Sequence, residues 1–291
     1  MLNRFAAAID YLTVGHITRD LLPGGGATTG GTAAYATLTA QRLGLRPGIL
    51  TAFNPEEDLG PLIDIPIAGT PAETSTTFEN IPTPEGRLQR VSARAPDIHP
   101  HMLPESWRSC QVVHFGPVLD EIDLSLLRLF PEALLGATPQ GWLRRIEPDG
   151  TVVQAEWAEA AYVLEQVDAA VLSDEDTGRD ERMVRSFAEA CRVLVVTAGP
   201  AGCRLFIDGF PTAIPTVGLD EVDATGAGDI FAAVFFSHLS HHDDPLEAAR
   251  FAVLLATASV RRRGLSGVPT ESEIHEAAAA LQPDRTSGRW T

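Results

Sequence analysis

The most unusual absence from this 291-residue sequence is lysine, because all 22 of its basic residues are arginine. This absence excludes mechanisms that need a lysine amine, such as a Schiff base, a P-loop lysine or the strand lysine of protein kinases. The glycine-rich run from Gly24 to Thr32 is therefore not a P-loop, since no Gly-Lys-Ser/Thr ends it. Any phosphate chemistry here relies on backbone N–H groups, arginine and metal ions.

Other scarce features indicate where in the cell the protein is located and which kinds of partner it can bind. Cys110, Cys191 and Cys203 are few and widely spaced, which argues against a disulfide framework or zinc site and favours a reducing cytoplasm. No apolar run approaches the roughly 20 residues that span a bilayer, and Asp10 interrupts the N-terminal apolar stretch, so we expect neither a membrane helix nor a signal peptide. A net charge of −17 disfavours nucleic acid and membrane partners, but a bound metal and backbone dipoles still permit a nucleotide.

The order of apolar segments predicts one α/β domain over residues 1–291. Strands alternate with helices, which is typical of parallel βαβ units and of a sheet covered on both faces. Residues 282–291 are expected to form a frayed tail. Strands are predicted at 9–17, 47–53, 111–115, 133–137, 169–172 and 193–197, hairpins at 75–80 with 87–93 and at 204–207 with 212–214, and helices at 32–43, 122–130, 156–166, 176–190, 227–239, 245–262 and 270–281.

The most informative segment is Gly226-Ala227-Gly228-Asp229, which directly precedes an apolar helix. Three small residues let backbone N–H groups approach an anion closely, and the unpaired N–H groups of a helix start favour negative charge. An aspartate beside a phosphate site is electrostatically costly unless it takes a proton from the attacking group. The alternative is a glycine-rich turn in which Asp229 is only a helix-start charge.

The same segment carries a family resemblance. Asp223 to Phe231 reads Asp-x-Thr-Gly-Ala-Gly-Asp-x-Phe and resembles the C-terminal signature of the ribokinase-like (PfkB) family of small-molecule kinases. The resemblance implies a ribokinase-like three-layer α/β/α fold with a mostly parallel central sheet and a small, reduced β lid. It also implies that Asp229 is the catalytic base, and that Gly226, Ala227 and Gly228 form the anion hole for the transferring phosphoryl group.

Further matches suggest where the acceptor binds. Asp20 follows the first predicted strand, where the family has a substrate-binding aspartate, although without the resemblance a loop aspartate that caps a turn is the favoured interpretation. Gly30 and Gly31 resemble the family's N-terminal Gly-Gly motif, and Tyr35 stands where relatives commonly have asparagine. Because the segment from Asp20 to Gly30 is short, we expect a lid formed mainly by residues 74–94. This hairpin is similar to one in the inositol-kinase-like branch, with residues 74–80, Thr77 among them, and Arg90 lining the sugar side, or else it is only an edge ribbon.

The second half of the chain resembles the family's nucleotide site. Thr197 to Gly202 matches Thr-x-Gly-x-x-Gly, and Ser173 and Asp176 replace an Asn and a Glu, so that Asp176 is expected to hold Mg²⁺ through water. Thr138 to Arg144 resembles an Asp-Pro-Gln-Gly segment whose role we leave open. The residues expected to contact the nucleotide are Ser173, Thr197, Gly199, Gly202, Thr225, Val253 and Ala256.

We therefore predict a cytoplasmic, monomeric or homodimeric kinase that uses ATP and Mg²⁺ to phosphorylate a hydroxyl of a small sugar, cyclitol or nucleoside. One alternative is a ribokinase-like protein that binds its ligand without kinase activity. A dinucleotide-dependent oxidoreductase is disfavoured, because no Gly-x-Gly-x-x-Gly follows the first strand.

Overall fold

The computed structural model describes residues 8–22, 24–83, 86–216, 218 and 220–281, so the predicted C-terminal tail lies outside it. The strands are β1 Tyr11–Val14, β2 Thr18–Leu21, β3 Ala27–Gly30, β4 Pro47–Phe53, β5 Ile67–Pro71, β6 Thr76–Thr83, β7 Gly86–Ala93, β8 Val112–Phe115, β9 Leu134–Ala137, β10 Arg144–Ile146, β11 Val152–Gln154, β12 Ala169–Ser173, β13 Val193–Thr197, β14 Cys203–Ile207 and β15 Phe210–Ile214. The α-helices are α1 Thr32–Arg42, α2 Ala160–Gln166, α3 Glu181–Ala190, α4 Ala227–His242, α5 Pro245–Ser259 and α6 Glu271–Leu281.

The central sheet has nine strands in the order β15-β14-β13-β12-β9-β8-β1-β4-β5. All neighbours from β13 to β5 pair in parallel, whereas β14 and β15 continue the sheet as an antiparallel hairpin. The turn of this hairpin is Asp208-Gly209, and both residues have the positive φ that such a turn requires. The mostly parallel sheet and this hairpin confirm the expected α/β topology.

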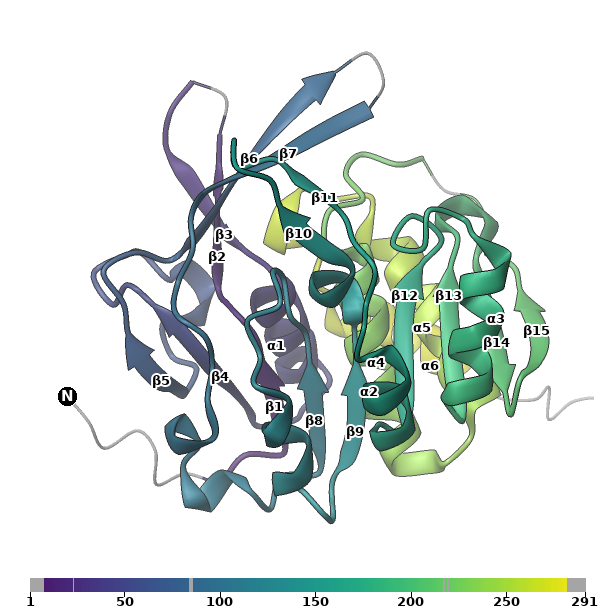
Figure 1. Cartoon of the computed structure of the whole chain (residues 1–291). Coiled ribbons are helices and arrows are strands. Elements are labelled where there is room, and N and C mark those ends of the chain that lie inside the picture. Colours follow the sequence, from purple (N-terminus) through teal and green to yellow (C-terminus); the bar gives the residue numbers. More distant parts are fainter. Residues whose placement is uncertain (1–7, 23, 84–85, 217, 219, 282–291) are drawn as a thin grey trace, which may run out of the picture.

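Helices cover both faces of this sheet, and each central strand contributes side chains to two hydrophobic cores. In β12, Ala170 and Leu172 belong to the core under α2 and α3, whereas Ala169 and Val171 belong to the core under α1, α4 and α5. Burial on both faces explains why the strands read as continuous apolar runs rather than alternating ones. The predicted three-layer α/β/α architecture is confirmed (Figure 1).

A second sheet, in the order β3-β2-β6-β7, forms the lid above the central sheet (Figure 1). The predicted hairpin is present as β6 and β7, but β2 and β3 add two lid strands in a segment for which the sequence predicted no strand. Gly24, Gly25 and Gly26 all have positive φ in the segment that joins β2 to β3. The lid therefore extends beyond residues 74–94, whose strands β6 and β7 remain its longest. The two short polar strands carry no alternating pattern that would have predicted them.

Three predicted helices begin later or differ in type. Residues 124–129 form a 3₁₀ helix, and α2 begins at Ala160 rather than at residue 156. The helix predicted from residue 176 begins at Glu181, because Gly178 and Arg179 have positive φ and Asp180 caps the helix by accepting a hydrogen bond from Arg182 N–H.

None of the helices among the described residues combines the length and apolarity needed to cross a membrane.

Candidate active site

A cleft of about 940 Å³ lies between the lid and the carboxyl ends of the central strands. In parallel α/β sheets this is the edge at which ligands bind. Ser173 and Thr197 are the last residues of β12 and β13, and both line it. The predicted residues that line the cleft are Asp20, Gly31, Tyr35, Ser173, Asp176, Thr197, Gly199, Gly202, Thr225, Gly226, Ala227, Gly228, Asp229, Val253 and Ala256.

Asp229 lies in the first turn of α4 and is partly exposed to the cleft. Its Oδ1 accepts a hydrogen bond of 2.7 Å from Thr32 Oγ1 at the start of α1. Desolvation raises the pKa of Asp229 to about 6, against the lowering effect of the Thr32 hydroxyl, and the Asp176 and Asp20 carboxylates raise it further whereas Arg144 lowers it. Such a carboxyl group is largely ionised at neutral pH and can accept a proton there.

The backbone N–H groups of Gly226 and Gly228 have no hydrogen-bond partner in the part of the chain that the structure describes. Ala227 N–H differs, because it donates to Ala224 O over 3.1 Å. Two of the three amides expected to hold an anion are therefore available, and the third is already engaged in a turn. Both available amides lie within three residues of Asp229, at the electropositive start of a helix.

The conformation of this loop depends on its neighbours. Gly226 has a φ of 80°, and an added Cβ there would lie 2.3 Å from ring carbons of Tyr35. The Tyr35 ring is buried beneath the loop, so it supports the loop in addition to lining the cleft. Asp223 anchors the loop by accepting hydrogen bonds of 2.9 Å from the N–H groups of Thr225 and Gly264.

The lid side of the cleft is polar. Asp20 on β2 faces it, and an added Cβ at Gly30 would lie 2.6 Å from Asp20 Oδ2, so the glycine leaves room for that carboxylate. Asn80 and Gln89 are cross-strand partners on β6 and β7, and Gln89 Nε2 donates to Asn80 Oδ1 over 3.1 Å. Carboxylate and amide groups of this kind are suited to bind hydroxyls.

Three predicted acceptor residues are not among those lining the cleft. Gly30 lies against the carboxylate of Asp20, and Asp20 rather than Gly30 lines the cleft. Thr77 is buried and donates to Ser75 O over 2.9 Å, and Arg90 lies 3.9 Å from Asp149 at the surface. The register of the hairpin explains the difference, because neighbouring residues of a strand face opposite sides, so that Asn80 and Gln89 line the cleft and Arg90 does not.

The opposite end of the cleft is more apolar. Val253, Ala256 and Val260 of α5 and its end form one wall, and the loop after β13 forms another. Gly202 in that loop has a φ of 89°, and an added Cβ would lie 2.1 Å from Ile214 O, so only glycine fits. The cleft thus joins a polar acceptor end to an apolar end through the amides of α4.

Asp176 lines the cleft near enough to Asp229 to raise the pKa of that carboxyl group, and its geometry fits a metal bound through water. Its Oδ2 accepts from Ser173 N–H over 2.8 Å, and its Oδ1 accepts from Gln140 Nε2 over 3.1 Å. Each oxygen keeps a further lone pair for water. Within the described ranges, no group of three or more His, Cys, Asp or Glu side chains is arranged to hold a metal. The residues therefore fit a Mg²⁺ that keeps its waters and arrives with phosphates, not an all-protein cage.

Sequence reasoning gave no role to Thr32, Arg144, Gln89 or Arg179. Thr32 and Arg144 act on the pKa of Asp229, and Gln89 and Arg179 line the cleft, as do Phe78 and Asn80 of the expected segment 74–80. Because alternate residues of a strand face the same side, one hairpin residue known to face the cleft would have identified the other lid residues that line it. No local signal links Thr32 to Asp229, because they are 197 residues apart in the sequence.

Residues 166–272 match the model of the pfkB family carbohydrate kinase. The "Probable fructokinase-6, chloroplastic" of Arabidopsis thaliana is 32% identical over 130 residues, which are 42% of this chain and 34% of that protein. The inositol 3-kinase of Zea mays is 29% identical over 233 residues, which are 78% of this chain and 59% of that protein. The matched part thus spans less than two thirds of each relative.

Among solved structures, a pyrophosphate-dependent kinase of the ribokinase family, in complex with a pyrophosphate analogue and myo-inositol, superposes with a TM-score of 0.76. The superposition covers 92% of this chain and 99% of that chain at 21% identity, which establishes the shared fold. The matched segment includes the β12 to α5 half of the cleft with Gly226 to Asp229. The chain thus has the fold of ribokinase-family kinases, and its residues 166–272 are similar to the pfkB family carbohydrate kinases.

Proposed function

We propose that this protein transfers the γ-phosphoryl group of ATP to a hydroxyl of a small sugar, cyclitol or nucleoside. The observation that carries the proposal is the position of Asp229 beside the available amides of Gly226 and Gly228, inside one cleft. The carboxylate takes the proton of the attacking hydroxyl, and the amides stabilise the negative charge on the phosphoryl oxygens. This intact arrangement weighs against a protein that only binds its ligand.

The polar end of the cleft supports a polyol acceptor. Asp20, Asn80 and Gln89 provide one carboxylate and two amides, which together accept from and donate to several hydroxyls. The similarity to an inositol 3-kinase and a fructokinase favours a cyclitol or sugar.

The apolar end supports a nucleotide donor. The wall of Val253, Ala256 and Val260 offers a surface for a base, which a donor without a base would leave uncovered. Mg²⁺ bound near Asp176 would neutralise phosphate charge. Arg144 and Arg179 also line the cleft and supply positive charge in a chain without lysine.

The first experiment is a screen for ADP release with ATP, Mg²⁺ and a panel of inositols, sugars and nucleosides. We expect ADP release with at least one acceptor. Because one structural neighbour uses pyrophosphate, a parallel series with pyrophosphate measures orthophosphate release. Turnover with pyrophosphate but not with ATP would contradict the proposed donor, and binding of acceptors with neither product would contradict phosphoryl transfer.

The raised pKa of Asp229 predicts a pH dependence. Only the ionised carboxylate takes a proton, so kcat/KM should fall about tenfold per pH unit below the pKa and stay level above it, with the midpoint at about 6. Thr32→Val removes the hydroxyl that lowers this pKa and should move the midpoint upward. Thr32→Ser keeps the hydroxyl and should retain the wild-type profile. An unshifted midpoint in Thr32→Val would show that this hydrogen bond does not tune the base.

Asp176 is expected to govern the need for Mg²⁺. Replacing the carboxylate with an amide removes one negative charge from the water shell of the ion, so Asp176→Asn should need about tenfold more Mg²⁺ for half-maximal activity. Glu165→Gln is the matched control, because Glu165 is an exposed residue of α2 that does not line the cleft, and its replacement removes the same charge. Equal Mg²⁺ curves for both variants would contradict the assignment of Asp176.

A further inference from the structure

The chain passes between the central sheet and the lid four times, and three of these passages meet at His16. His16 lies in the passage from β1 to β2, Thr76 opens β6, and Ala95 and Pro96 follow the end of β7. The fourth passage runs from β3 into α1 at Gly31. His16 and Thr76 are fully buried, so the meeting point is sealed from solvent.

The side chain of His16 binds the other two passages directly. Its Nε2 lies 2.9 Å from Pro96 O, and because a carbonyl oxygen only accepts, Nε2 carries the proton. Its Nδ1 lies 2.8 Å from Thr76 Oγ1, which in turn accepts a hydrogen bond of 3.0 Å from Ala95 N–H. One imidazole and one hydroxyl thus join three separate segments of backbone.

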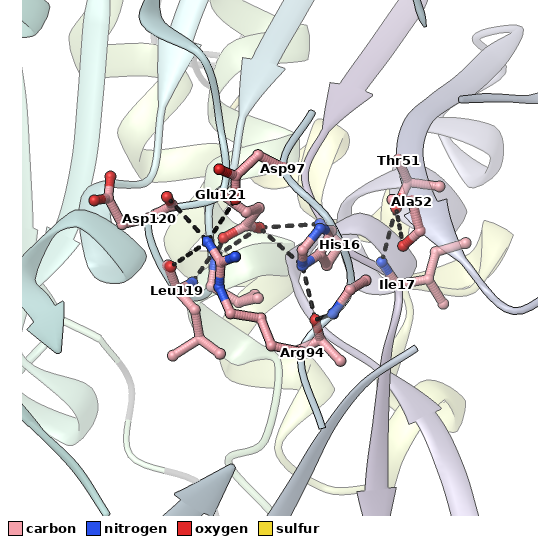
Figure 2. A network of polar contacts seen from close by, with 12 residues as sticks. His16, Ile17, Thr51, Ala52, Arg94, Asp97, Leu119, Asp120 and Glu121 are labelled. Atoms are coloured by element: carbon pink, nitrogen blue, oxygen red, sulfur yellow. Dashed lines mark hydrogen bonds and ion pairs between the residues drawn. The ribbon is translucent and has the colours of Figure 1, made fainter. Parts of the chain in front are cut away.

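The main chain of His16 is held from the side of the central sheet. Its N–H donates to Glu121 Oε1 over 3.1 Å, and the next amide, Ile17 N–H, donates to Thr51 Oγ1 of β4 over 3.2 Å (Figure 2). The carboxyl group of Glu121 is fully buried and also accepts from Val118 N–H and Leu119 N–H.

This joint continues into the lining of the cleft. Val118 and Leu119 form a small hydrophobic cluster with Phe78 of the lid strand β6, and both Val118 and Phe78 line the cleft. On the outer side, Arg94 Nη2 donates to Asp97 Oδ1 over 2.7 Å and lies 3.4 Å from the carbonyl oxygen of Leu119 (Figure 2). The segment after β7 is therefore tied to the loop of Glu121 on both its buried and its exposed sides.

We propose that His16, Thr76 and Glu121 form a joint that fixes the orientation of the lid over the acceptor end of the cleft. Apolar contact between Phe78 and Val118 allows sliding, whereas directional hydrogen bonds between three passages do not. A buried polar network with every member paired makes the backbone rigid at that point. None of the three lines the cleft, so they are positioning residues for Asp20, Asn80 and Gln89.

The test compares Thr76→Val with Thr76→Ser in the full-length chain. Valine keeps the shape of threonine but removes the hydroxyl, leaving His16 Nδ1 and Ala95 N–H without their shared partner, whereas serine keeps the hydroxyl. His16→Gln is a second variant, because its amide reaches Pro96 O but not Thr76. Amide hydrogen exchange of the unliganded protein is measured for β6 and β7, with β13 as the reference strand.

We expect exchange in β6 and β7 to become about tenfold faster in Thr76→Val and His16→Gln, the effect of losing one buried hydrogen bond. In both variants, exchange in β13 should match that of the wild type. In Thr76→Ser, exchange in all three strands should match that of the wild type. Unchanged exchange in β6 and β7, or an equal increase in β13, would overturn the proposal.

The kinetic measurement rests on the proposed function, whereas the hydrogen-exchange measurement needs no turnover. A failure of the lid proposal can therefore be distinguished from a failure of the proposed function. With an acceptor from the screen, we expect Thr76→Val to raise the acceptor KM about tenfold, to leave the KM of ATP within about twofold, and to keep most of kcat, since the donor end does not touch the joint. Equal increases in both KM values would contradict a role specific to the lid.

Discussion

Asp229→Asn should lower kcat by roughly 10² to 10⁴-fold, the usual contribution of a general base, while the affinity for nucleotide stays nearly unchanged. The amide has the same shape as the carboxylate but accepts no proton at neutral pH. The hydrogen bond from Thr32 Oγ1 to Oδ1 can persist, so the variant tests chemistry rather than packing. Steady-state kinetics with an acceptor from the screen, together with calorimetric titration of nucleotide, measure both quantities.

Asp243→Asn provides the matched control. Asp243 caps the other end of the same helix α4 in a left-handed conformation that asparagine also adopts readily. It removes the same charge from the same helix without touching the cleft, so its kcat should equal that of the wild type. Wild-type turnover in Asp229→Asn would refute the role of Asp229 as the base.

Gly226→Ala should lower kcat by roughly 10² to 10³-fold, the effect of losing an anion-hole donor. Alanine is strained at a φ of 80°, and its Cβ would lie 2.3 Å from the Tyr35 ring, so the loop has to move. Movement displaces the amides of Gly226 and Gly228 from the place where the phosphoryl charge develops. The thermal midpoint of unfolding should also fall, which calorimetry measures.

Gly44→Ala separates strain from catalysis. Gly44 has a φ of 86°, but an added Cβ meets no atom within 4 Å, and the residue does not line the cleft. It carries a similar backbone cost of about 1–2 kcal/mol without the clash, so it should lose stability and keep kcat. If Gly226→Ala kept wild-type kcat, the loop would not be the anion site.

The parts of the fold that the sequence predicted best are those set by local apolar runs. The bounds of β4 and β13 agree with the prediction, because each strand is a run of buried residues that stops at a polar one, Asn54 directly after β4 and Thr197 at the end of β13. The turn at Asp208-Gly209 was predictable because few other residue pairs adopt two successive positive φ angles.

The lid strands β2 and β3 were not predictable from local pattern. They contain four residues each and read Thr-Arg-Asp-Leu and Ala-Thr-Thr-Gly. β2 pairs with β6, which lies more than 50 residues further along, and β3 joins the sheet by pairing with β2. Their strand state is thus set by tertiary pairing, which overrides the weak β-propensity of such short polar segments.

The candidate site also has a part that local sequence predicts and a part that it does not. The loop of Gly226 to Asp229 could be predicted from the sequence because its functional residues follow one another along the chain. The partner of Asp229 and the joint at His16 depend on residues far apart in the chain, and the face of the hairpin that lines the cleft depends on its register. Thr77 and Arg90 do not line the cleft for the same reason that they could not be placed from sequence, since the register of a strand decides which residues face inward.

The most direct test of the account follows the phosphate itself. The wild-type protein is mixed with ATP labelled in the γ-phosphoryl group, Mg²⁺ and the acceptor found in the screen, and the labelled products are separated. The account predicts that the label moves to the acceptor with release of one ADP per phosphorylated product. Bound ATP and bound acceptor with the label still in ATP, or label recovered only as inorganic phosphate, would contradict it.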